Sequence, residues 1–345
     1  MKCFRPDRLT IAMREFTKSV LKTSSQGSLN LASIVTNDTE TIEPVLFCAT
    51  RGYDASSHIE KFASQEHKEL ISVALGSPES IIQATNAIMT AHKKCCWLIL
   101  KNVHLVSYWI PQLEKKLQSL KAVNGFKVFI TLEMKDDIPT NLILMSRVLI
   151  FEPPSGVKSN LSQLLPSLRQ YQTADTPAEF SRLAVIICWL HAVIQERLYY
   201  KPFGWTKAFE FNDADFHSSL QVVKTWLTQC AQGRSNILPS KIPWKAIKQL
   251  LKETIYGGKV DNEVDYMTLE ALIDKYLHPS VFERGFELVS EKDNHPAITL
   301  PDTVGKDVYE KWLASLPSSQ SPHWLGIPDE SERIIMSHTG KSLSS

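Results

Sequence analysis

The sequence predicts an α/β fold in which a five-stranded parallel sheet flanked by helices is followed by a helical small subdomain. The first observation is that five short, predominantly apolar runs, of which Val45–Cys48 is apolar throughout, alternate with helical patterns up to about residue 155. Such runs are typical of strands buried on both faces, and their alternation with helices predicts a parallel sheet covered on both sides. The second observation is a change to long helical segments after that point.

Local patterns place the elements of the first half. A helix begins after the first strand, where Asp54 or Ser56 can act as its N-cap. Pro78 stands near the first position of the next helix, where proline is favoured. A further helix is expected over Ser107–Ser119. The five strands are expected at Val45–Cys48, Ile71–Leu75, Cys96–Leu100, Lys127–Leu132 and Val148–Phe151.

The second half is expected to hold four long helices. Asp213 or Asp215 can cap the second of them, and Asp261 or Asn262 can cap the fourth. Gly257-Gly258 is expected to end the third, since glycine satisfies helix C-termini. The four helices are predicted at residues 178–199, 213–231, 243–256 and 262–277.

The charge balance and the apolar runs exclude several classes of protein. Thirty-eight basic and 37 acidic residues leave no net field that would attract nucleic acid or anionic lipid. The longest apolar run, Leu183–Leu190, is far shorter than a membrane span, and no secretory signal precedes the first helix. Six cysteines lack the spacing of a zinc site and are expected as buried thiols in a reducing compartment. We expect a cytoplasmic protein without nucleic-acid or membrane partners, and the abrupt start suggests a piece of a longer chain.

The segment after the first strand has the layout of a phosphate-binding loop but lacks its chemistry. The P-loop pattern is G-x-x-x-x-G-K-[ST], in which glycines expose backbone N–H groups and the lysine reaches the phosphates. When Ser57 is placed on the final hydroxyl position, Ser56 stands where the lysine belongs. Thr50 and Ala55 then replace the two glycines, and Gly52 lies between them.

The residues at the ends of the third and fourth strands also differ from those that an ATPase needs. An α/β domain followed by a helical lid is the layout of AAA+ ATPases, which need an acidic pair after the third strand for Mg²⁺ and water. Here that pair is Lys101-Asn102, a cation and an amide. Thr131 stands at the sensor-like position of the fourth strand. We expect no catalytic residue, no bound cofactor and no metal in this segment.

Other kinds of site have weaker support. Residual nucleotide binding or ATPase activity is one alternative, and an independent cytosolic scaffold derived from an AAA+ fold is another. His58 and His104 follow the first and third strands and could meet at one edge of the sheet. No further ligands stand at metal-binding spacing around them, so caps or core contacts are the preferred interpretation.

Several ordered motifs resemble the sixth AAA+ module of dynein heavy chains, nearer the cytoplasmic than the axonemal type. The resemblance covers about residues 1–340, and the link out of a fifth module resembles residues 4–8 (FRPDR). The motifs are 52–56 (GYDAS), 97–105 (WLILKNVHL), 113–117 (LEKKL), 151–158 (FEPPSGVK), 191–197 (HAVIQER), 202–205 (PFGW), 255–263 (IYGGKVDNE) and 324–328 (WLGIP).

The resemblance implies a mechanical role within a larger motor. The parent heavy chain would be a minus-end-directed microtubule motor whose ATP is bound and hydrolysed in other modules. The sixth module of that family binds no nucleotide; it closes the ring and transmits conformational change. Its partners would be the adjacent AAA+ modules of the same chain. Intermediate chains, light chains and the microtubule would be reached only through regions absent here, and the location would be the cytoplasmic microtubule cytoskeleton.

The resemblance also implies a division into four parts. Residues 1–38 would be the end of the preceding module and a connector, 39–157 the large α/β subdomain, and 158–278 the helical small subdomain. Residues 279–345 would be a loop-rich C-terminal extension with one helix at 306–316. Arg147, just before the fifth strand, could face a neighbouring module or form an ordinary structural ion pair.

Overall fold

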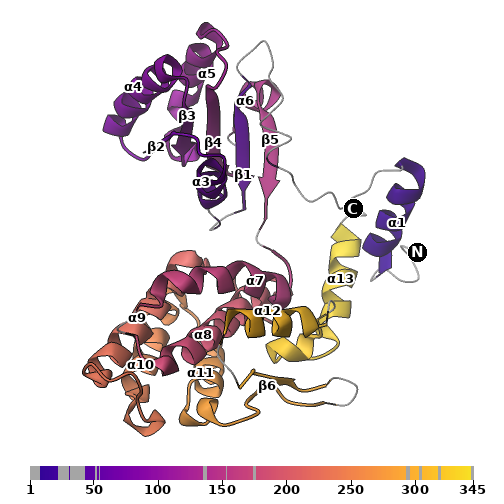
Figure 1. Cartoon of the computed structure of the whole chain (residues 1–345). Coiled ribbons are helices and arrows are strands. Elements are labelled where there is room, and N and C mark those ends of the chain that lie inside the picture. The colour runs from indigo at the N-terminus through magenta and orange to yellow at the C-terminus, as the bar shows by residue number, and fades with distance from the viewer. Residues whose placement is uncertain are drawn as a thin grey trace. The chain divides into compact units, whose positions relative to one another are not determined.

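The chain divides into two compact units, each described separately below (Figure 1). One spans Ser24–Pro153, and the other combines Met1–Thr23 with Pro154–Ser345. The computed structural model describes residues 8–21, 31, 43–50, 53, 55–134, 138–152, 154–173, 176–292, 296–302, 305–317 and 320–342.

The first unit contains the five-stranded parallel sheet that the sequence predicts. The strand order is β2-β3-β4-β1-β5, and every neighbouring pair is parallel. The strands are β1 (Val45–Ala49), β2 (Leu70–Ala74), β3 (Trp97–Lys101), β4 (Lys127–Glu133) and β5 (Arg147–Phe151).

Helices cover both faces of this sheet. Alternate residues of β3 point to opposite sides: Leu98 belongs to a core with α4 and α5, whereas Ile99 belongs to a core with α3. This is the alternation that a twice-covered sheet requires. The expected helix from Ser107 begins instead at Ile110, because residues 103–109 form a tighter 3₁₀ segment, η2. The helices are α3 (Ser56–Gln65), α4 (Pro78–Lys94), α5 (Ile110–Ser119) and α6 (Thr140–Met145).

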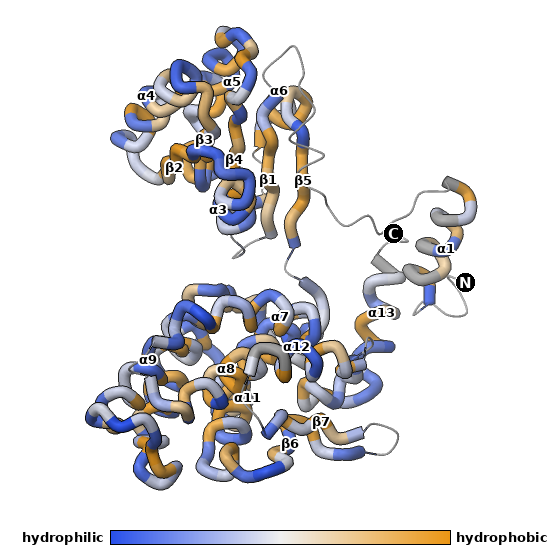
Figure 2. Tube along the Cα trace, viewed as in Figure 1, coloured by the Kyte–Doolittle hydropathy of each residue, from blue (hydrophilic) through white to orange (hydrophobic). Residues whose placement is uncertain are grey.

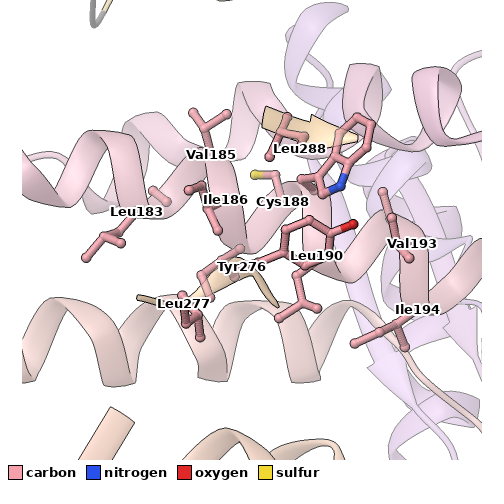
Figure 3. Close-up of a cluster of buried hydrophobic side chains, with 14 of the residues drawn as sticks. Leu183, Val185, Ile186, Cys188, Leu190, Val193, Ile194, Tyr276, Leu277 and Leu288 are labelled. Atoms are coloured by element: carbon pink, nitrogen blue, oxygen red, sulfur yellow. The ribbon is translucent and has the colours of Figure 1, made fainter. Parts of the chain in front are cut away.

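The second unit is built around α8 (Ala178–Glu196), whose side chains are buried on all sides. Figure 3 shows its residues packed against Tyr276 and Leu277, and against Leu288 of the hairpin. The colouring of Figure 2 places apolar residues along α8 and along the strands of the sheet. The stretch Ala178–Tyr200 is long and apolar enough to cross a membrane, but 78% of its apolar window is buried, as in the core helix of a globular domain.

Of the remaining elements, α7, α9 and α11 pack directly on α8, whereas α1 packs on α13. The α-helices and strands are α1 (Leu9–Leu21), α7 (Val157–Leu164), α9 (Asp213–Ala231), α10 (Trp244–Leu250), α11 (Glu263–Tyr276), β6 (Glu287–Val289), β7 (Ile298–Thr299), α12 (Lys306–Ser315) and α13 (Ser331–Ser342). Short 3₁₀ or π turns are η3 (Leu165–Tyr171), η4 (Arg197–Tyr200), η5 (Pro239–Lys241), the π turn η6 (Leu251–Ile255), η7 (Gly257–Lys259), η8 (Pro279–Phe282) and η9 (Pro322–Leu325).

The structure corrects two local predictions in this unit and selects between two alternatives in a third. Asn212, rather than Asp213 or Asp215, caps α9, while the Asp215 carboxylate accepts a hydrogen bond from the Asn212 N–H in a reciprocal capping box. Asn262 caps α11, as one of the two alternatives predicts. The segment after residue 278 is more ordered than its turn-rich composition suggests, since it contains the β6–β7 hairpin, α12 and α13.

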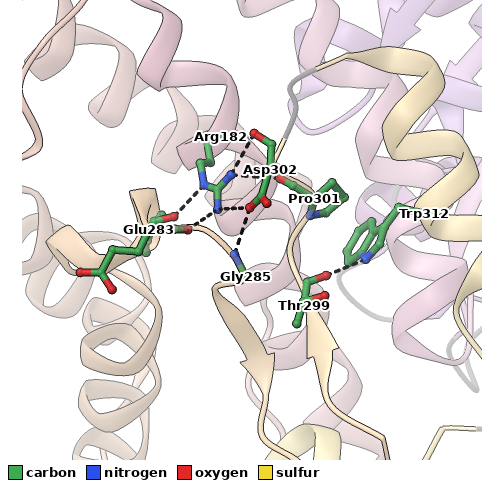
Figure 4. Close-up of polar contacts among 8 residues, drawn as sticks. Arg182, Glu283, Gly285, Thr299, Pro301, Asp302 and Trp312 are labelled. Atoms are coloured by element: carbon green, nitrogen blue, oxygen red, sulfur yellow. Dashed lines mark hydrogen bonds and ion pairs between the residues drawn. The ribbon is translucent and has the colours of Figure 1, made fainter.

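Arg182 attaches the hairpin segment to α8 (Figure 4). Its Nε donates to the carbonyl of Val281 at 2.6 Å, and Nη2 donates to that of Glu283 at 3.1 Å. Nη1 donates to the carbonyls of Pro301 at 3.0 Å and Asp302 at 3.4 Å. The guanidinium is therefore satisfied mainly by backbone carbonyls on both sides of the hairpin.

A buried histidine in this unit predicts loss of stability in acid. The His191 ring is fully buried, and its Nδ1 lies 3.0 Å from the Tyr256 hydroxyl. Burial, together with the positive charges of His217 and Lys259, lowers the pKa of His191 to about 3. Between about pH 3 and the unfolded value of 6.5 only the unfolded chain binds this proton, so unfolding becomes easier as the pH falls through that window.

We expect the free energy of unfolding of this unit to fall by up to about 1.4 kcal/mol per pH unit below pH 6.5 through this group. In the variant His191→Gln, whose side chain does not titrate, the free energy of unfolding should depend less on pH. Urea unfolding across pH 4 to 7 measures this slope. His338→Gln, at an exposed position of α13, is the matched control and should keep it. An unchanged slope in His191→Gln would contradict the assignment.

Candidate functional site

The candidate site lies where β1, β3 and β4 end, because these strands are parallel neighbours and share one carboxyl edge. After β1 the helix α3 begins at Ser56, whose side chain is buried. Ala55 is its N-cap residue and makes no capping hydrogen bond, so Ser56 is the first helical residue and not the predicted cap. Ser57 is half-buried. Gly52, like Asp54, lies outside the described residues.

The position after β3 holds an internal ion pair. The Lys101 ammonium lies 2.5 Å from Oε1 of Glu60, which stands one helical turn after Ser56 on α3. The side chains are 23% and 46% exposed, so solvent weakens the attraction between them. An ammonium at the end of β3 repels a divalent cation. Its carboxylate partner comes from α3, the helix that follows the degenerate loop. Glu60 is not among the predicted site residues; its i+4 spacing from Ser56 places it on the same face of α3, but nothing in the sequence pairs it with Lys101.

The next residue joins the predicted acidic-pair position to the sensor-like position. Asn102 has φ 59° and ψ 41°, a left-handed conformation that asparagine tolerates better than most residues. Its backbone N–H donates to the Thr131 hydroxyl at 3.2 Å. Thr131 is only 4% exposed. The structure thus brings Lys101, Asn102 and Thr131 together, with the threonine hydroxyl already bound to the neighbouring strand end.

The two histidines are occupied by separate local partners. The Glu133 backbone N–H donates to Nδ1 of His104 at 3.1 Å, and Nε2 lies 3.8 Å from the Glu133 carboxylate. His58 shares a 2.8 Å hydrogen bond with the Tyr53 hydroxyl and packs on the ring of Phe151. Within the part of the chain that the structure describes, no group of three or more His, Cys, Asp or Glu side chains could hold a metal.

Arg147 lies at the opposite, amino-terminal end of the sheet. It is the first residue of β5, and its Nη2 donates to the Glu43 carboxylate at 2.9 Å. The structural ion pair was one of the two predicted alternatives for this side chain.

Two family models match the two parts of the chain. Residues 40–150 match the dynein heavy chain region D6 P-loop domain, and residues 180–331 match the dynein heavy chain AAA lid domain. The first range contains the parallel sheet with the degenerate loop, and the second contains α8 and most of the helices around it.

Similar proteins include cytoplasmic dynein heavy chains over the full length of this chain. The chain is 39% identical to that of Dictyostelium discoideum over 99% of its length, and 37% identical to that of Drosophila melanogaster over 100%. It is 32% identical to cytoplasmic dynein 2 heavy chain 1 of Chlamydomonas reinhardtii over 96%. It spans only 7–8% of the length of these relatives. The chain belongs to the dynein heavy chain family and comprises the region of its D6 P-loop domain and AAA lid.

Proposed function

We propose that this region is a non-catalytic AAA+ module of a dynein motor ring that binds no nucleotide. In a motor of this family it would close the ring between its neighbouring modules and transmit conformational change, while ATP is bound and hydrolysed elsewhere in the heavy chain. Its direct partners would be those modules, and it would act in the cytoplasm during minus-end-directed movement along microtubules. Intermediate chains, light chains and the microtubule would be contacted through other regions of the heavy chain.

The observation that carries this proposal is the Lys101–Glu60 ion pair. Mg-ATP needs a cation on its phosphates and carboxylates on its metal. Here Ser56 supplies no charge, and the ammonium of Lys101 stands at the metal side, bound to a carboxylate at 2.5 Å. Removing one buried charge partner from a binding site typically costs about 2–5 kcal/mol, so this combination leaves little affinity for Mg-ATP.

Exposed apolar side chains support a role in contacts with other modules. In the α/β unit, Leu144 is 79% exposed and Ile150 54% exposed. In the helical unit, Phe16 of α1 is 68% exposed. These side chains would be covered if the module packs against its neighbours in a ring.

The proposal predicts no binding of Mg-ATP to this chain. Isothermal titration at protein concentrations of tens of micromolar should give no binding heat with Mg-ATP or Mg-ADP, and the melting temperature should not rise with either ligand. A nucleotide-binding P-loop protein, titrated in parallel, is the control. Binding with a micromolar Kd would overturn the proposal and favour the alternative, a module with residual nucleotide binding or ATPase activity.

The remaining alternative, an independent scaffold, concerns the same surfaces. A heavy-chain module should associate with its neighbouring modules when these are supplied as a longer recombinant chain. An independent scaffold would bind other partners and would fold in the absence of the neighbouring modules. Cross-linking mass spectrometry on the intact heavy chain distinguishes the two, because only a ring module gives reproducible cross-links to both adjacent modules.

A further inference from the structure

The first turn of α7 is bound by side chains that are distant in sequence. The Gly156 N–H donates to Oε2 of Glu196 at 2.7 Å, and the Val157 N–H donates to Oε1 of Gln320 at 2.7 Å. The first N–H groups of any helix have no partner within the helix. Here those groups are satisfied by the end of α8 and by a segment 163 residues further along the chain.

Glu196 and Gln320 are also bound to each other. Nε2 of Gln320 donates to Oε1 of Glu196 at 2.6 Å, and Nδ2 of Asn160 lies 3.5 Å from Oε2. The carboxyl group is only 4% exposed, and burial raises the pKa of Glu196, whereas the hydrogen bonds from Gly156 and Gln320 favour its ionised form. A buried carboxylate is costly unless donors surround it, so this one depends on its three partners. We call Gly156, Val157, Asn160, Glu196 and Gln320 the α7 clasp.

The backbone of the clasp also requires glycine. Gly156 has φ 95° and ψ 139°, a conformation that is strained for any residue with a Cβ. The two units divide between Pro153 and Pro154, so this glycine lies two residues after the division. The chain therefore enters the helical unit through one fixed backbone conformation.

Two neighbouring side chains attach the same C-terminal segment on either side of the clasp. The Lys158 ammonium donates to the carbonyls of Leu316 at 2.5 Å and Ala314 at 3.2 Å, at the end of α12. Arg197 donates to the carbonyl of Leu325, and burial lowers the pKa of Arg197 to about 10. The side chains of Lys158, Glu196 and Arg197 thus bind Ala314, Leu316, Gln320 and Leu325 of the C-terminal segment.

We propose that the α7 clasp acts as a lock, by which the C-terminal segment holds the first turn of α7, at the start of the helical unit, in its helical conformation. Through Gln320 and Glu196 the C-terminal segment fixes the point at which the connector from the α/β unit ends and the rigid helical unit begins. When the lock is opened, the first turn of α7 unfolds and the connector lengthens. The lock does not depend on whether the module binds nucleotide, because it lies entirely within the helical unit.

A charge swap between the two central residues tests the lock. In Gln320→Glu two carboxylates face each other, and in Glu196→Gln the charge is lost. In the double variant Glu196→Gln/Gln320→Glu, the new amide can still accept from Gly156 and donate to position 320, and the new carboxylate can accept from Val157. The arrangement of donors and acceptors is then restored with the charge moved to the other side chain.

Amide hydrogen exchange across residues 154–165 of the full chain is the measurement. We expect Gln320→Glu to speed exchange there by at least about tenfold, as loss of roughly one charged hydrogen bond implies, and the double variant to return it close to the wild-type rate. Gln221→Glu, at an exposed position of α9, is the matched control and should change nothing in this segment.

Three results would overturn the proposal. If the amides of residues 154–165 exchanged in Gln320→Glu at the wild-type rate, the contacts of Gln320 would not stabilise the first turn of α7. Exchange in the double variant as fast as in Gln320→Glu would mean that the two side chains do not act as a pair. An equal acceleration in α9 would mean that the whole unit is destabilised and that no local lock exists.

Discussion

Replacement of Arg182 by lysine is expected to destabilise the helical unit by about 3 kcal/mol. The guanidinium donates from three nitrogens to four backbone carbonyls, two on each side of the β6–β7 hairpin. Lysine has one nitrogen and cannot reach all of them, so carbonyls of Val281, Glu283 or Pro301 would lose their donor. The residue is only 6% exposed, so water cannot easily replace the lost bonds. A loss of this size is a large part of the roughly 5–15 kcal/mol that stabilises a typical domain.

The measurement is urea unfolding, monitored through hydrogen exchange at the amides of α8. That readout separates the helical unit from the α/β unit, which need not unfold at the same denaturant concentration. Arg169→Lys, at an exposed position of η3, is the matched control and should change stability by less than about 0.5 kcal/mol. If Arg182→Lys were as stable as this control, the hairpin would be held by its apolar contacts alone.

The central strands β1, β3 and β4 were predictable from sequence because both of their faces are buried, whereas the edge strands β2 and β5 are partly exposed and were indicated by their apolar residues alone. A strand covered on both sides must be apolar throughout, and each predicted strand lies within one or two residues of the observed one. The shift of the second strand, from Ile71–Leu75 to Leu70–Ala74, has a simple cause. Leu75 is buried although it lies beyond the strand, so its apolarity does not mark the strand end.

The chemistry of the candidate site was only partly predictable. The alternation of strands and helices alone places Lys101, Asn102 and Thr131 along one edge of a parallel sheet. The partner of Lys101 is Glu60, 41 residues away, and the partner of Thr131 is a backbone N–H, 29 residues away. A pattern read along the chain contains residue types but no such pairings, because the register of α3 against β3 is set by packing in three dimensions.

Helix ends were the least predictable feature for a similar reason. Asn212, Asp213 and Asp215 are all good capping residues, and the sequence pattern does not rank them. The structure uses two of them in one capping box, with Asn212 as the cap and Asp215 as its reciprocal partner. Asp215 also binds Lys259 at 2.6 Å, a contact across 44 residues that fixes its orientation. Tertiary contacts thus select among local alternatives that are equal in isolation.

Replacement of Gly257 by alanine is expected to be among the most destabilising single changes in the helical unit, at more than about 3 kcal/mol. A Cβ at this position would lie 1.6 Å from the carbonyl oxygen of Lys252, which belongs to the backbone and cannot turn away. The π turn η6 creates this close approach, since the Tyr256 N–H donates five residues back to Leu251. Gly257-Gly258 follows the end of η6, as predicted, but neither glycine has the positive φ that is typical of a glycine after a helix C-terminus.

The adjacent glycine supplies an unusually close control. A Cβ on Gly258 would meet the carbonyl oxygen of Glu253 at 3.5 Å, an ordinary contact, so Gly258→Ala should be neutral or should stabilise the chain by up to about 1 kcal/mol through the unfolded state. Urea unfolding of the two variants, read at the α8 amides, then measures the backbone contact itself, because the two substitutions add the same methyl group one residue apart. Equal stabilities would show that the turn after η6 can relax, and that close approach of Lys252 does not require glycine at position 257.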